Sequence, residues 1–94
     1  MQITDVKIRK RFDGVPLCAV ASVTFDNCFT VHDVKVIHAG DRYFTVMPNR
    51  KTADGRTVDI AHPIDRAFRS KLENCVLNAY YEVEKADKNS SAIL

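Results

Sequence analysis

The spacing of apolar residues changes near residue 65, and this change constrains the fold more than any other feature of the chain. Before it, apolar and polar residues alternate, as they do in half-buried β-strands. After it, apolar residues recur at intervals of three and four, which is typical of one face of an α-helix. The helical set comprises Phe68, Leu72, Cys75, Val76, Ala79, Tyr80 and Val83. The sequence therefore predicts an α+β fold in which strands precede one C-terminal helix.

Turn signals divide the first part of the chain into strands. Asp26-Asn27 and Ala39-Gly40-Asp41 are residues that tolerate positive φ, and both follow alternating segments. Residues 43–47 form a fourth predicted strand that Pro48 ends. Asp54-Gly55 marks a further turn, so that residues 57–60 could form a short edge strand. The expected sheet is an antiparallel meander of about four to five strands.

The third predicted strand contains an irregularity. Phe29 and Val31 share one parity, whereas Val34 and Val36 share the other. A bulge near His32-Asp33 would return all four to one face of the sheet. A strand that is covered on both faces is the alternative interpretation.

The helix is predicted to begin after Asp65, a favourable N-cap residue. It should run for about 20 residues, to near Lys85. Residues 1–84 then form a single domain, and residues 85–94 form a flexible polar tail. A domain of this size buries only about 60% of its unfolded surface, so a dimer would help to stabilise it.

Composition favours a cytoplasmic protein. We find no apolar run near the ~20 residues that span a bilayer, and no signal peptide. The three cysteines form an odd set without paired spacing, which suits a reducing compartment.

The formal charge of +2 is unevenly distributed. Residues 1–11 carry four cations and one acid, and residues 49–71 carry six cations and three acids, so each block sums to +3. The remaining segments, 12–48 and 72–94, each sum to −2. Two basic blocks on a mildly acidic body indicate a polyanionic partner, although chance variation of a charged surface is the alternative.

The second basic block supplies the candidate nucleic-acid-binding residues. Three are expected in a loop and three in the first turns of the helix, where backbone N–H groups can share phosphates with them. They are Arg50, Lys51, Arg56, Arg66, Arg69 and Lys71. Asn49 could read a base edge, but a turn-capping role is the stronger expectation. Lys7, Arg9 and Arg11 share one predicted strand face and could extend the patch, or could simply be solvated.

The remaining polar and aromatic residues do not indicate catalysis. His32, His38 and His62 lack zinc-ligand spacing, and no set of nucleophile, base and orienting group is evident. We therefore expect no enzyme activity, no cofactor, no metal and no small-molecule substrate. Tyr43, Phe44, Tyr80 and Tyr81 could stack on bases, although packing is the more common role.

Several motifs, taken in order along residues 1–83, resemble the SpoVG family (stage V sporulation protein G, or septation protein). They are Ile3-Thr4-Asp5-Val6-Lys7-Ile8-Arg9, Ala21-Ser22-Val23-Thr24-Phe25-Asp26, Val31-His32-Asp33-Val34-Lys35-Val36-Ile37, Met47-Pro48, Asp54-Gly55 and Asp59-Ile60-Ala61-His62-Pro63-Ile64.

The resemblance implies an antiparallel sheet with a C-terminal helix, and a homodimer joined through sheet strands. It also implies binding to DNA and RNA, with roles in gene regulation, septation and sporulation. In the family, a basic pair after Met-Pro and an arginine early in the helix are associated with nucleic-acid contact, and these correspond to Arg50, Lys51 and Arg69. Asn49 stands where the family pattern leads us to expect serine. The alternative hypothesis is an interaction protein of the division machinery whose basic surface meets an acidic partner.

Overall fold

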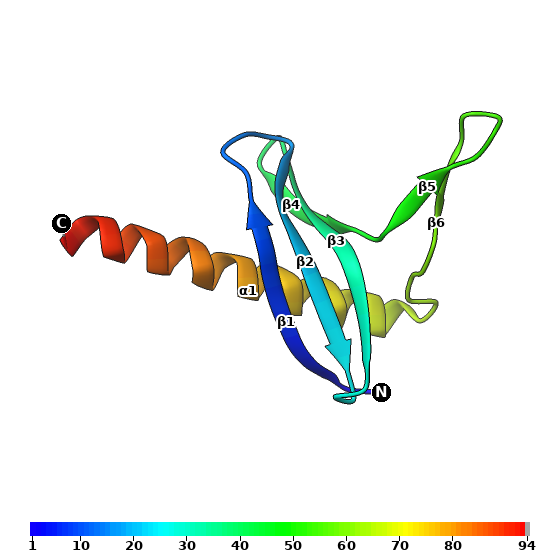
Figure 1. Cartoon of the computed structure of the whole chain (residues 1–94), viewed down its shortest axis with the longest axis horizontal. Coiled ribbons are helices and arrows are strands. Elements are labelled where there is room, and N and C mark those ends of the chain that lie inside the picture. Colours follow the sequence, from blue (N-terminus) through cyan, green and yellow to red (C-terminus); the bar gives the residue numbers. More distant parts are fainter. Residues whose placement is uncertain (94) are drawn as a thin grey trace.

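The computed structural model describes the backbone of residues 1–93 and the side chains of residues 1–87. One antiparallel sheet contains β1 (Ile3–Arg11), β2 (Leu17–Phe25), β3 (Phe29–Ala39) and β4 (Arg42–Val46), in that order. A second sheet pairs β5 (Asn49–Lys51) with β6 (Thr57–Asp59), and α1 spans Arg66–Ile93. The helix lies across one face of the larger sheet, and the β5–β6 hairpin projects away from it (Figure 1). The predicted α+β meander with a C-terminal helix is confirmed.

The two predicted hairpin turns of the larger sheet are present. Asp26 and Asn27 have φ angles of 52° and 55°, and the Cys28 N–H donates to the Phe25 carbonyl at 3.0 Å. Gly40, with φ of 66°, lies in the turn between β3 and β4. Residues that tolerate positive φ therefore set the register of neighbouring strands.

The bulge predicted in β3 is confirmed. Val31 pairs with Val23 and Val34 pairs with Ala21, so His32 and Asp33 both stand opposite Ser22. Asp33 takes a φ of 65°, which accommodates the extra residue. The bulge turns Val31, Val34 and Val36 toward the helix. The alternative of a strand covered on both faces is wrong, because in the described chain only α1 packs on this sheet.

Strand β1 contains two further irregularities that were not predicted. The pairing with β2 shifts once at Thr4 and once at Arg9. As a result Arg11 faces the helix, where it forms ion pairs with Glu84 and Asp87. The prediction that Lys7, Arg9 and Arg11 share one face is therefore wrong for Arg11. The extra residue of a bulge shifts the alternation of side chains between the two faces of the strand.

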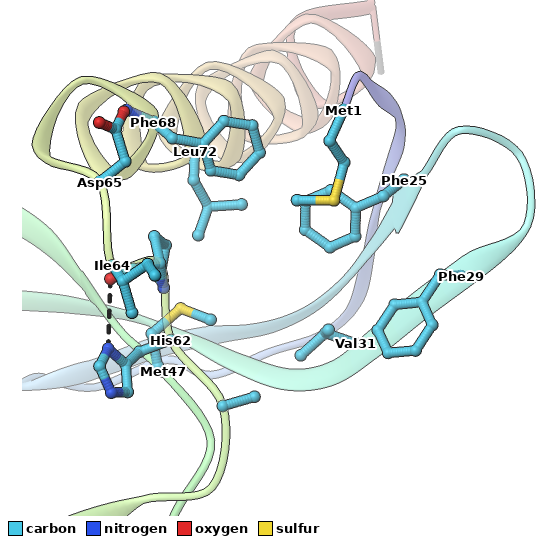
Figure 2. A pocket seen from close by; sticks show the side chains of 12 residues that line it. Met1, Phe25, Phe29, Val31, Met47, His62, Ile64, Asp65, Phe68 and Leu72 are labelled. Atoms are coloured by element: carbon cyan, nitrogen blue, oxygen red, sulfur yellow. Dashed lines mark hydrogen bonds between the residues drawn. The ribbon is translucent and has the colours of Figure 1, made fainter.

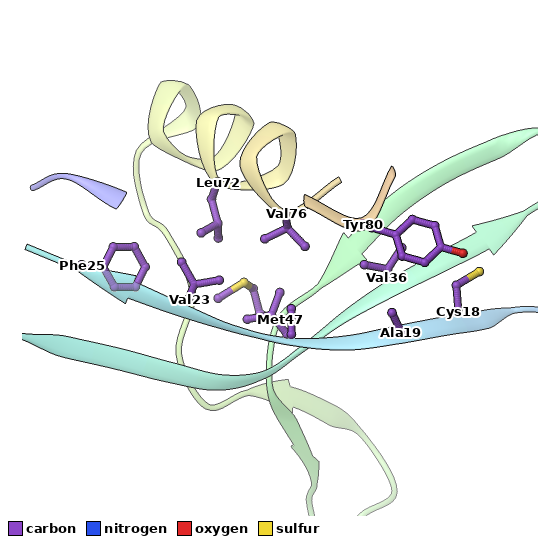
Figure 3. Close-up of a cluster of buried hydrophobic side chains, with 11 residues drawn as sticks. Cys18, Ala19, Val23, Phe25, Val36, Met47, Leu72, Val76 and Tyr80 are labelled. Atoms are coloured by element: carbon purple, nitrogen blue, oxygen red, sulfur yellow. The ribbon is translucent and has the colours of Figure 1, made fainter. Parts of the chain in front are cut away.

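The core lies between α1 and the sheet (Figure 3). Leu72 and Val76 of α1 are almost fully buried against small and β-branched residues of the central strands. Those residues are Ala19, Ala21, Val23, Val34 and Val36. Burying each large apolar side chain stabilises the fold by about 1.5–3 kcal/mol.

The helix begins as predicted and ends later. The Phe68 N–H donates to Asp65 Oδ2 at 2.8 Å, which confirms the N-cap. The helix continues past Lys85 to Ile93, so residues 85–93 of the predicted tail are helical. This segment contains no glycine or proline that would stop a helix. Its flexibility stays a prediction, and Leu94 lies outside the described residues. Within the described chain, α1 is not apolar enough over a sufficient length to cross a membrane.

Candidate nucleic-acid interface

Arg50 and Lys51 lie on the projecting hairpin (Figure 1). The prediction that they lie in a loop is wrong, since both belong to β5 and pair with Val58 and Thr57 of β6. The segment Asn49-Arg50-Lys51 has no apolar residue, so it shows no alternation from which a strand could be predicted. Neighbouring residues of a strand point to opposite sides. The two exposed cations therefore flank a narrow ribbon.

The tip of the hairpin fixes Arg56 in a local ion pair. Its Nε donates to Asp54 Oδ2 at 3.0 Å, and the Thr52 hydroxyl donates to the other carboxylate oxygen. The hydrogen bond from Thr52, followed by that from the Arg56 N–H, lowers the pKa of Asp54 below its ordinary value of 3.8. Gly55, with φ of 86°, completes the turn. Arg56 is thus partly neutralised, which makes it the weakest of the six candidates.

The base of the hairpin is held by backbone groups. Asn49 Nδ2 donates to the Met47 carbonyl at 2.9 Å, and the Ile60 N–H donates to the Pro48 carbonyl at 2.7 Å. The predicted turn-capping role of Asn49 is therefore confirmed. This hydrogen bond uses one of the two N–H donors of the amide, and a contact of Asn49 with a base edge stays a prediction.

Arg66 and Arg69 lie together at the start of α1. Both line a hollow of about 340 Å³ with residues 62–65, and Arg69 Nη2 donates to the Pro63 carbonyl at 3.3 Å. The first turn of the helix contains no acidic residue, although the N-cap Asp65 precedes it. The positive end of the helix dipole and two guanidinium groups therefore coincide.

Lys71 does not join this pair. It follows Arg69 by two positions, or about 200° around the helix. Because Phe68 and Leu72 point toward the sheet, Lys71 and Arg69 project on opposite flanks of the buried stripe. The structure therefore brings Arg66 and Arg69 together, presents Arg50 and Lys51 on a ribbon, and leaves Lys71 apart.

Most of the candidate cations are free of carboxylate partners. Among the described side chains, ion pairs involve Arg11 and Arg56, and none involves Arg50, Lys51 or Arg66. Within the same part of the chain, Arg69 and Lys71 also take part in none. Exposed, unpaired cations can meet phosphates without first breaking an ion pair.

The aromatic residues have a packing role. Tyr43 lies between His38, stacked at 4.1 Å between ring centroids, and the helix residues Tyr80 and Tyr81, at 6.0 and 5.5 Å. Tyr80 is buried. The expectation that packing dominates is confirmed for Tyr43 and Tyr80.

Two features were not predicted from the sequence. One is an apolar groove of about 340 Å³ between the sheet and the helix start, lined by side chains such as Phe25, Met47 and Phe68 (Figure 2). Ile64, at its rim, is 95% exposed. The other is a hydrogen bond between Ser22 and His32 at 2.8 Å. The apolar Ile64, which follows His62-Pro63 and precedes the predicted N-cap Asp65, was the available sequence signal for the groove.

Comparison with known proteins gives a consistent result. The family model SpoVG matches residues 1–82. A protein of Clostridium acetobutylicum named "Putative septation protein SpoVG" is 47% identical over 91 residues, which cover 97% of this chain and 96% of the relative. A protein of the same name from Caldanaerobacter subterraneus subsp. tengcongensis is 50% identical over 91 residues, 97% of each chain. Another from Desulforudis audaxviator is 44% identical over 87 residues, 93% of this chain and 99% of the relative.

Proposed function

The chain belongs to the SpoVG family, and from this premise we propose that it is a small regulatory protein that binds DNA and RNA without catalysis. The relatives' names link it to septation, and the family name links it to sporulation. The observation that supports nucleic-acid binding is a set of cations that have no ion-pair partner among the described side chains, Arg50 and Lys51 on the hairpin and Arg66 and Arg69 at the start of α1. We place its action in the cytoplasm, where its three cysteines would stay reduced.

The geometry favours contact with the sugar–phosphate backbone. Arg50 and Lys51 stand on a narrow projecting ribbon, which can follow a groove or a strand of nucleic acid. Arg66 and Arg69 add two guanidinium groups at a helix N-terminus, which favours anions. Contacts of this kind supply affinity and little sequence preference.

We propose further that the protein acts as a homodimer. Phe29 and Ile64, which line the apolar groove, are 63% and 95% exposed, and a second copy would cover this surface. Two copies of the basic surface would then bind one nucleic acid with higher avidity than either alone.

The test is a mobility-shift titration of Arg50→Ala plus Lys51→Ala at two salt concentrations. Loss of two phosphate contacts per protomer should weaken binding to every sequence and lower the slope of log K against log salt by about 1.4–1.8 for each protomer that is bound. Arg42→Ala plus Lys85→Ala removes the same charge from exposed positions outside the interface and is the matched control. Unchanged binding by the first double variant, with its fold intact by circular dichroism, would refute the assignment.

An interaction protein of the division machinery is the second candidate. The relatives' names include septation, and the apolar groove of Figure 2 is a surface on which a protein could dock. Pulldowns with and without nuclease separate the candidates. Partners that all survive nuclease treatment favour this second function, whereas their loss favours nucleic-acid binding.

A further inference from the structure

A second polar site lies on the open face of the larger sheet. A pocket of about 330 Å³ is lined there by Arg9, Val20, Ser22, His32 and Asp33. Ala21 and Val23 are buried toward the helix, so Ser22 between them points to the opposite face. Ser22 is nevertheless only 6% exposed, because the side chains of neighbouring strands surround it.

The β3 bulge builds this site. It places His32 and Asp33 together opposite Ser22, and the Ser22 hydroxyl lies 2.8 Å from His32 Nδ1. Asp33 holds a positive φ of 65°, which the bulge imposes on a non-glycine residue. The hydrogen bond engages Nδ1, which leaves Nε2 of the exposed imidazole as the atom that can contact a ligand.

The charges that face the pocket are mainly positive. Register places Lys7 opposite Ser22, and Lys10 and Lys35 opposite Val20, on the same face as Arg9. The Lys10 ammonium lies 5.1 Å from the centre of the Phe12 ring. The acids on this face are Asp33 and, opposite Thr24, Asp5. None of these groups takes part in an ion pair among the described side chains.

We propose that this pocket binds a phosphate-type oxyanion and that protonation of His32 strengthens the binding. With a neutral imidazole protonated on Nε2, the Ser22 hydroxyl donates to Nδ1. When Nδ1 gains a proton, that N–H donates to Ser22 Oγ, and the hydroxyl hydrogen turns toward the anion. Ser22, His32 Nε2–H and the Arg9 guanidinium then all donate, and the positive excess on this face grows by one. None of the residues that line the pocket lies on the hairpin or at the helix start, so failure of this proposal would leave the proposed function standing.

Sulfate is the probe of choice, because its charge stays constant from about pH 5.5 to 8, which is roughly the range in which histidine changes charge. NMR of the imidazole protons, in sulfate and in chloride at equal ionic strength, follows each histidine separately. Saturating sulfate should move the midpoint of the His32 titration upward by about one pH unit, equivalent to about tenfold tighter binding to the protonated ring. His38, which stacks on Tyr43 and lines neither this pocket nor the hollow at the helix start, is the internal control and should not respond in this way.

Two variants and a second ligand complete the test. Arg9→Gln should reduce the sulfate response severalfold, whereas Arg42→Gln, a matched loss of charge, should preserve it. A short oligothymidylate in place of sulfate identifies the source of the anion. A response to both ligands assigns the pocket to nucleic-acid phosphate as well, and a response to sulfate alone assigns it to a free oxyanion. An unmoved His32 midpoint with both ligands, or an equal shift of His38, would overturn the proposal.

Discussion

The four-stranded body and the β5–β6 hairpin are stabilised in different ways. In the body, Leu72 and Val76 of α1 are buried against apolar residues of β2 and β3. Judged by Cα distances within the described chain, β5 and β6 contact each other and no other helix or strand. The hairpin instead depends on its turn, on the Asn49 side chain at its base and on six paired residues. A two-stranded hairpin without a covered face is only marginally stable in water.

Because of this difference, the stability of the fold and the proposed binding by the hairpin depend on different residues. The body determines whether the chain folds, whereas the hairpin carries Arg50 and Lys51 without contributing to the core. Substitutions in the hairpin should therefore change affinity at almost constant stability. Substitutions in the body should change the free energy of unfolding while leaving the hairpin chemistry unchanged.

The largest effect should come from truncating the body core. Leu72→Ala removes a side chain that is only 1% exposed and should destabilise the protein by about 2–5 kcal/mol. Val58→Ala, the matched apolar truncation in the half-buried centre of the hairpin, should cost less than about 1 kcal/mol. Urea unfolding followed by circular dichroism measures both values. Equal losses would show that the hairpin belongs to the same cooperative unit as the body.

The next effect tests the junction between the two regions. Asp65→Ala removes the acceptor for the Phe68 N–H and should cost about 1 kcal/mol of stability. Asp59→Ala removes a carboxylate from the hairpin strand β6 and serves as the control. Thermal unfolding of both variants at one pH gives the comparison. A cost for Asp59→Ala as large as that for Asp65→Ala would mean that charge, rather than capping, determines the loss.

The same division explains what could be predicted from the sequence. The body was predictable because burial imposes a pattern, and the parity change between Val31 and Val34 was enough to indicate the β3 bulge. The bulge at Thr4 had a signal of the same kind, the parity change between Ile3 and Val6, which the prediction did not use. The bulge at Arg9 had none, since only the cations Lys10 and Arg11 follow it in β1. Strand β5 has no core to face, so no apolar residue marked it.

The candidate site, too, was predictable only where a pattern along the sequence marked it. Charge patterning identified Arg66 and Arg69, which the structure places together at one hollow. It could not show that Arg56 is paired with Asp54, because that contact depends on the conformation of the turn. The Ser22–His32 contact required the register of two strands, which spacing along one strand does not contain.

At high pH the body should weaken before the hairpin. Burial, and secondarily a hydrogen bond with Glu84, raise the pKa of the Tyr80 hydroxyl far above its ordinary value of 10.0. Above pH 10 the unfolded chain therefore releases this proton while the folded chain retains it, so stability is fully present below pH 10 and declines as the pH rises further. Urea midpoints at pH 8 and at about pH 10.5 measure the decline. Tyr80→Phe should show a smaller decline, and an identical one would assign it to other groups.

At low pH the hairpin should respond before the body, and the change should be confined to the hairpin tip. Hydrogen bonds from the Thr52 hydroxyl and the Arg56 N–H lower the pKa of Asp54, so this carboxylate supports the turn above pH 3.8 and loses that role as the pH falls through the lowered value. Because Asp54 is exposed, the global free energy of unfolding should hardly respond. Amide chemical shifts of residues 52–56 should report the titration, and Asp54→Asn should abolish it. If protonation of Asp54 shifted the urea midpoint of the whole protein, the hairpin would be coupled to the body after all, and affinity could not be changed there without changing the fold.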